Sequence, residues 1–113
     1  MKVTHVFMAL AAADHAASVA WYERLLGRGP DMVPTEGEAV WRLADSASVY
    51  IVADPDRAGR AAVTIAVPDL DELLGDLRER GIAATIVMDA GMRTGVVMDP
   101  DENRIKFFED PST

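Results

Sequence analysis

Apolar residues recur along this chain with two periods, which predict an alternation of strands and helices. Residues 2–10 are mostly apolar and predict a strand buried on both faces, although the run 6–13 also imitates the core of a signal peptide. The residues before that run are fewer than the about 15–30 of a signal peptide, so we interpret it as a strand. From Asp14, an expected N-cap, helical spacing predicts a helix over 14–26 that ends at Gly27.

Three short apolar segments follow this helix, and turn-forming residues separate them. We predict strands over 31–33, 39–44 and 48–53. Alternating apolar residues predict a further strand over 61–67, which Pro68 ends. The first half of the chain therefore has the order strand, helix and three strands.

The second half repeats this order after its opening strand. Asp69 and Glu72 form a capping pair, and the apolar stripe behind them predicts a helix that ends before Gly81. Three more strands are predicted over 82–88, 95–98 and 104–108.

The two helices begin at equivalent places, because Asp14 and Asp69 are separated by a period of about 55 residues. This repeat predicts a single α+β domain over the whole chain, with one module at about 1–57 and a second at about 58–113. Residue identity between the halves is poor, so an unrelated mixed fold of the same length is the alternative.

The composition is that of an ordinary globular protein, with 50% hydrophobic and 27% charged residues. A formal net charge of -8 opposes binding to nucleic acid or to an anionic membrane. The same charge would concentrate a cationic ligand, although acidity that only maintains solubility is the plainer interpretation. The lack of cysteine excludes disulfides and thiolate metal sites, and no run approaches the about 20 apolar residues of a membrane helix. We expect a cytoplasmic protein.

Several segments carry a resemblance to a known family. His5 on the first strand is followed by Trp-Tyr-Glu-Arg-Leu-Leu-Gly at 21–27, and the chain closes with Gly-Met-Arg-Thr at 91–94 and Asp-Pro-Asp-Glu-Asn-Arg-Ile at 99–105. These segments resemble the vicinal oxygen chelate group of glyoxalases, bleomycin resistance proteins and extradiol dioxygenases. The resemblance implies an α+β fold of two βαβββ modules that curl a mixed sheet into a half-open cup, with one helix on each module. It also implies a homodimer.

The turn before the last strand departs from the closing motif of the group. Pro100 at its second position predicts a type I turn. Glu102 stands where the group often has Gly, and glutamate rarely adopts a positive φ. The sequence therefore predicts a turn with ordinary backbone angles.

The usual metal site of the group has no complete counterpart in this sequence. Metal enzymes of the group hold a divalent ion with His, Gln or Glu side chains from four strands, and His5 matches the first position. Ile51 or a neighbour, Ala62 or Val63, and Lys106 match the other three, and none of these is a normal ligand. We therefore expect no divalent metal and no other cofactor.

A cup around His5 would be mainly apolar with a few polar groups, as small-molecule sites generally are. A lone His on an apolar strand is also often hydrogen-bonded in the interior. If His5 faces the cup, alternation places Phe7 beside it, and Lys106 and Phe108 enter from the last strand. The remaining candidate ligand-binding residues are Trp41, Arg42, Tyr50, Ile51, Thr64, Met92 and Arg93.

Three functions are compatible with the sequence. The first is a metal-free protein that binds an apolar, aromatic or cationic small molecule, as resistance members of the group do by sequestration. The second is an enzyme of lyase, isomerase or dioxygenase type that uses His5 as acid or base, or an unrecognised metal site. The third is an interaction module whose own side chains fill the cup. We favour the first because the sequence shows no nucleophile with an evident base.

Overall fold

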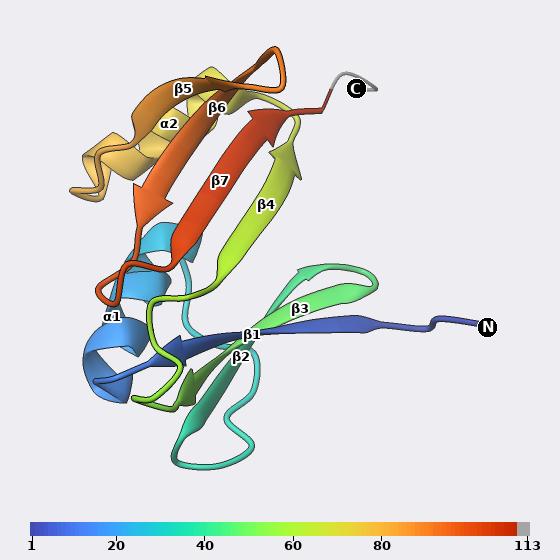
Figure 1. The fold of residues 1–113 in the computed structure, drawn as a ribbon, viewed down its shortest axis with the longest axis vertical. Coiled ribbons are helices and arrows are strands. Elements are labelled where there is room, and N and C mark those ends of the chain that lie inside the picture. Colours follow the sequence, from blue (N-terminus) through green and yellow to red (C-terminus); the bar gives the residue numbers. More distant parts are fainter. Residues whose placement is uncertain (111–113) are drawn as a thin grey trace.

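The computed structural model describes residues 1–110 and contains two mixed β-sheets, each with one helix (Figure 1). The strand orders are β1-β3-β2 and β4-β7-β6-β5, and in each sheet the first and last strands of the module pair in parallel. This confirms the predicted α+β class; residues 111–113 of the predicted second module lie outside the described residues. The elements are β1 (Val6–Ala12), α1 (His15–Leu26), β2 (Glu38–Ala44), β3 (Ala47–Ala53), β4 (Ala62–Val67), α2 (Leu70–Glu79), β5 (Thr85–Asp89), β6 (Met92–Met98) and β7 (Arg104–Glu109).

Several predicted strands differ from the structure in extent. The strand predicted over 2–10 is β1 at Val6–Ala12, and it is not buried on both faces, because Phe7 is 61% exposed. The strand predicted over 95–98 already begins at Met92.

The strand predicted over 31–33 is reduced to one isolated bridge between Met32 and Val40. The strand predicted from Ile82 begins later, because the Ile82 N–H donates to the Leu77 carbonyl at the end of α2 and the Ile82 side chain is buried. Ile82 therefore closes the helix rather than opening the strand.

The predicted helix starts are confirmed. The Asp14 carboxylate accepts a hydrogen bond from the Ala17 N–H at 3.1 Å, and the Asp69 carboxylate accepts one from the Glu72 N–H at 3.0 Å. Each carboxylate satisfies a backbone donor that has no partner within its own helix.

Each helix end is bound by an arginine from the other module. The Arg24 guanidinium donates to the Arg80 carbonyl at 2.9 Å, and the Arg80 guanidinium donates to the Leu25 carbonyl at 3.0 Å. Gly27 and Gly81 have φ of 78° and 79°, and a Cβ on either would lie within 3.1 Å of the crossing arginine. The two glycines therefore leave room for each arginine to reach the C-terminal end of the other helix, where a positive charge is favourable.

The carboxylate of Asp99, in the turn between β6 and β7, is buried and fully hydrogen-bonded. It accepts from the Tyr22 hydroxyl of α1 at 2.6 Å, from the Asn103 side chain at 2.8 Å, and from the Asp101 and Asn103 backbone N–H groups at 2.8 and 2.9 Å. A buried charge without such partners would cost several kcal/mol. The closing motif therefore has a structural role that joins the second module to the first helix.

The same turn also binds the backbone of both modules. The Asn103 side chain donates to the Ala11 carbonyl of β1 and accepts from the Ala61 N–H before β4, each at 3.0 Å. The Asp101 carboxylate accepts from the Ser18 hydroxyl of α1 at 3.2 Å. One turn thus connects the start of each module.

The prediction of ordinary angles in this turn is wrong, because Glu102 has a φ of 71°. Asp99 draws the N–H groups of Asp101 and Asn103 toward its carboxylate, and the Glu102 N–H donates to the Asp99 carbonyl. This closed arrangement holds the residue between them in the left-handed region, which costs a residue with a Cβ about 1–2 kcal/mol.

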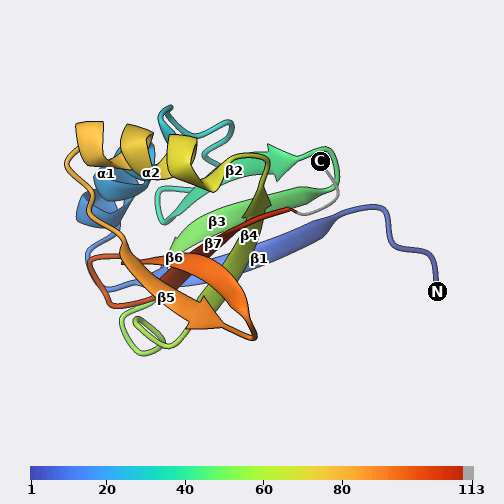
Figure 2. The ribbon, with the colours of Figure 1, turned by 90° about the horizontal axis from the view of Figure 1, so that it is seen from above.

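Each sheet buries one face against its helix and leaves the other open, and we call the open face the cup face. Figure 2 shows both helices on the same side of the molecule. Leu10, Trp41, Ile51, Ile105 and Phe107 lie on the helix-side faces and belong to one core shared by the modules. Alternation along the strands places the intervening residues on the cup faces.

We expect Glu102→Gly to raise the free energy of unfolding by about 0.5–1 kcal/mol, because relief of the left-handed strain exceeds the extra chain entropy of glycine. Urea denaturation would measure the change. Glu102→Ala is the control, since it retains a Cβ and should leave stability unchanged. An equal gain in both variants would assign the effect to the lost charge instead.

We expect Tyr22→Phe to lower the free energy of unfolding by about 1.5–3 kcal/mol, because Asp99 loses a buried donor. Burial, followed by the hydrogen bond to Asp99, raises the pKa of Tyr22. Tyr22 therefore makes its full contribution to the free energy of unfolding below pH about 10, the ordinary pKa of tyrosine. This contribution declines as the pH rises further, because only the unfolded state releases the proton. Denaturation of the parent protein and of Tyr22→Phe at pH 7 and above pH 10 would measure this. A difference in stability between the two proteins that grows with pH would contradict the prediction.

Candidate functional site

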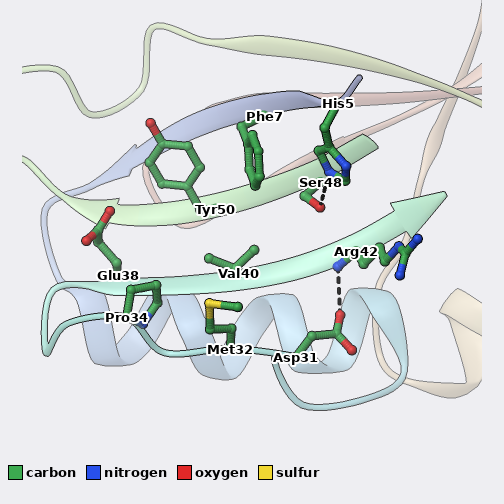
Figure 3. Close-up of a pocket in the computed structure, with 10 residues that line it drawn as sticks. All are labelled: His5, Phe7, Asp31, Met32, Pro34, Glu38, Val40, Arg42, Ser48 and Tyr50. Atoms are coloured by element: carbon green, nitrogen blue, oxygen red, sulfur yellow. Dashed lines mark hydrogen bonds between the residues drawn. The ribbon is translucent and has the colours of Figure 1, made fainter. Parts of the chain in front are cut away.

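The cup face of the first sheet forms the wall of an open cavity of about 660 Å³ (Figure 3). The loop between α1 and β2 forms its other side. The lining residues come from β1 and the residue before it, from β2 and β3, and from this loop: His5, Phe7, Asp31, Met32, Pro34, Glu38, Val40, Arg42, Ser48 and Tyr50.

Aromatic side chains follow one another along the cavity. The rings of His5 and Phe7 lie with centroids 4.4 Å apart and planes inclined by 33°. Phe7 is 61% exposed, and Figure 3 shows Tyr50 farther along the same wall, with Val40 and Met32 across from them. Such exposed aromatic faces can stack on a planar ligand.

His5 holds a polar contact at one end of this row. Its Nε2 atom lies 2.8 Å from the Ser48 hydroxyl oxygen, and Ser48 is only 4% exposed. The sequence did not reveal this contact, because it depends on the pairing of β1 with β3, which brings residues distant in the sequence together. No carboxylate among residues 1–110 is hydrogen-bonded to His5, so the contact is not a Ser-His-Asp set.

Asp31 fixes the loop that covers the cavity. Its carboxylate accepts from the Arg28 guanidinium and from the Arg42 backbone N–H, both at 2.7 Å. The hydrogen bond from Arg28, followed by that from Arg42, lowers the pKa of Asp31. The loop is also held by the Trp41 indole, which donates to the Arg28 carbonyl at 3.0 Å. The cavity wall is thus bound to β2.

A second cavity of about 500 Å³ continues along the same sheet, because it shares Glu38 and Tyr50 with the first. We call the two cavities together the groove. The residues that line only the second cavity are Ala9, Ala11, Val52, Asp54, Arg57, Arg60 and Ala61.

Four of the predicted site residues meet in the first cavity: His5, Phe7, Arg42 and Tyr50. Thr64, Lys106 and Phe108 occupy the cup-face register of the second sheet, where Lys106 pairs with Asp89 at 3.2 Å. Met92 lies in that sheet too, beside a smaller cavity at the start of α2. Neither groove cavity contains a residue of β4–β7, so this second group does not reach the groove within one chain.

Three predicted orientations were wrong. Trp41 and Ile51 are 0% exposed and lie in the core, so neither presents a free face to a ligand. Each is one residue away from a cup-face neighbour, and a shift of one residue reverses the face of a strand. Arg93 instead forms an ion pair with Asp71 at the start of α2.

The lining residues that were not predicted are Asp31, Met32, Pro34, Glu38, Val40 and Ser48. Glu38 and Val40 lie on the same face of β2 as Arg42, at every second residue. The alternation of side chains along a strand could therefore have revealed them. The three loop residues had no such signal, because the position of the loop depends on contacts with Arg28 and β2.

The donor set of a metal site does not gather around His5. Tyr50 and Val52, rather than Ile51, lie in the cup-face register of β3, and Lys106 is distant from the groove. Within residues 1–110, no three His, Asp or Glu side chains lie close enough to hold a metal ion.

A family model described as the Glyoxalase/Bleomycin resistance protein/Dioxygenase superfamily matches residues 2–107. The chain belongs to this superfamily. A glyoxalase / bleomycin resistance protein from Catenulispora acidiphila DSM 44928 is 41% identical, with a TM-score of 0.88 over 95% of this chain and 98% of that chain. A search of curated proteins found no significant match.

More distant superfamily structures share the fold. The bleomycin-binding protein from bleomycin-producing Streptomyces verticillus, complexed with copper(II)-bleomycin, is 23% identical, with a TM-score of 0.80 over 97% of this chain and 98% of that chain. A bleomycin-binding protein complexed with bleomycin is 19% identical, with a TM-score of 0.77 over 94% and 98% of the respective chains.

No helix in the described part of the chain is long and apolar enough to cross a membrane. The cytoplasmic location expected from the sequence stays a prediction.

Proposed function

We propose that this superfamily member binds an aromatic small molecule in the groove and does not transform it. The observation that carries the proposal is the exposed ring of Phe7, stacked beside His5 on the wall of an open 660 Å³ cavity. Burial of exposed apolar surface by a ligand is favourable at roughly 25 cal/mol per Å². The open cavity argues against the alternative in which the protein's own side chains fill the cup.

The proposal includes a place for a cationic group beside Glu38. This carboxylate lines both cavities, and within the described residues it accepts only from the Thr35 hydroxyl and has no ion-pair partner. A cation near the ring of Tyr50 would also gain a favourable interaction with its face. The net charge of -8 would assist the approach of such a ligand.

We further propose that binding requires no metal. The residues that contact His5 are Phe7 and Ser48, and the carboxylates of Glu38 and Asp31 in the same cavity do not form with it a group of three donors among residues 1–110. The polar groups of the groove therefore act as hydrogen-bonding and charged contacts for an organic ligand.

A homodimer is the proposed state of assembly. The groove is open to solvent, and the cup face of the second sheet exposes Val87 and Met98. A second copy that set this face against the groove would cover apolar surface on both chains. It would also bring Thr64, Lys106 and Phe108 toward the ligand.

Catalysis is the second candidate function, and the contact between His5 and Ser48 is the observation that favours it. A histidine can take the proton of a serine hydroxyl that attacks a carbonyl carbon. Hydrolysis of p-nitrophenyl acetate that is lost in both His5→Ala and Ser48→Ala would support catalysis over binding alone.

We expect the neutral dye N-phenyl-1-naphthylamine to bind, and Phe7→Ala to weaken its affinity about tenfold, because a stacking contact is removed. Fluorescence titration would measure the Kd. EDTA should leave the Kd unchanged, and Ile86→Ala is the matched control because Ile86 is an exposed apolar residue outside the groove. Loss of binding in EDTA would overturn the metal-free proposal, and equal effects of the two substitutions would overturn the site.

Light scattering should give twice the mass of one chain, and Val87→Asp should give a monomer because it places a charge in the proposed interface. Ile86→Asp is the control, since this adjacent residue on the same strand points to the opposite face. A monomeric parent protein, or equal dissociation in both variants, would contradict the proposed dimer.

A further inference from the structure

Two arginines line the groove beyond the aromatic row, together with Asp54, whose carboxylate pairs with Arg57. The second cavity of the groove runs from Glu38 and Tyr50 to Arg57 and Arg60. The floor between them consists of small residues on β1, Ala9 and Ala11. A ligand stacked on the aromatic wall could therefore extend over this floor toward the two arginines.

The two arginines differ in how much of their charge is free. Arg57 lies 3.8 Å from the Asp54 carboxylate, and its side chain is 85% exposed. Arg60 has no ion-pair partner among residues 1–110. Arg60 is therefore the stronger candidate for a charged contact with a ligand.

The segment that carries these arginines is fixed to the fold. At its start, the Asp54 N–H donates to the Ala12 carbonyl at 3.0 Å. After its end, the Ala61 carbonyl accepts from the backbone N–H of Arg104 at 3.0 Å. Gly59 has a φ of 86°, and a Cβ there would lie 2.3 Å from the Asp101 carbonyl oxygen. Close backbone packing thus holds the segment beside the groove.

The other cation of the groove, Arg42, is already engaged. Its guanidinium donates to the Asp45 carbonyl at 3.0 Å, and its backbone N–H donates to the Asp31 carboxylate at 2.7 Å. Glu38, between the two ends, would repel an anion from the centre of the groove. These charges direct an anionic group toward Arg60.

We infer that Arg57 and Arg60 form an anion-binding end of the groove, so that the ligand is an aromatic compound that carries a carboxylate, sulfonate or phosphate group at this end, separate from the cationic group proposed beside Glu38. Guanidinium groups bind such oxyanions through charge-assisted hydrogen bonds. This inference rests on the proposed function, because the aromatic part of the ligand must occupy the first cavity.

The test compares two naphthalene dyes, 1-anilinonaphthalene-8-sulfonate, which is anionic, and neutral N-phenyl-1-naphthylamine. Fluorescence titration of the full chain should show that Arg60→Gln weakens sulfonate binding about five- to tenfold and leaves the neutral dye unchanged. Arg57→Gln should have a smaller effect. Arg78→Gln is the control, because it removes the same charge from α2, outside the groove. Equal urea midpoints would establish that the variants fold alike.

Each outcome separates this inference from the proposed function. Unchanged sulfonate binding in Arg60→Gln, or equal weakening in Arg78→Gln, would overturn the anion-binding end while neutral dye binding upholds the groove. Weakening in Arg42→Gln alone would place the anion at the opposite end and overturn the inference. If the parent protein binds neither dye, or Phe7→Ala leaves neutral dye binding unchanged, the proposed function fails as well.

Discussion

The arrangement of the two modules depends on the buried carboxylate of Asp99. It receives the Tyr22 hydroxyl from the first module and donors from its own turn, while Asn103 in that turn binds the backbone of β1 and the residue before β4. A carboxylate removed from water requires all of these donors, so the turn has little freedom. That requirement accounts for the left-handed angle at Glu102 and sets the position of Gly59 nearby.

Each sheet has one face in the core and one open face, and the open face of the first sheet lines the groove. On β2 and β3, the buried residues Trp41 and Ile51 alternate with Arg42 and Tyr50 of the groove. The core residues hold the strands in register, and the register determines which side chains meet in the groove. The core and the groove are therefore built from neighbouring residues of the same strands.

The groove combines features that the superfamily resemblance alone does not supply. His5 keeps the first position of the metal pattern, yet its ring contacts Ser48 and Phe7 instead of a set of metal-binding donors. Charge then varies along the groove, from Arg42 through Glu38 to Arg60. In the proposed function, this order of charges would select a ligand by its charge and length as well as by its aromatic surface.

The sequence by itself determined the α+β class, the helix starts at Asp14 and Asp69, and the superfamily, because local periodicity and short-range capping carry those signals. It also placed His5 and Phe7 on one face, since alternation along a strand is local. It could not determine the faces of Trp41 and Ile51, because a shift of one residue reverses them, nor the angle at Glu102, which is imposed by hydrogen bonds to Asp99. Tertiary structure alone decided the contact between His5 and Ser48 and the approach of Arg60 to the groove, because these depend on packing between segments distant in sequence.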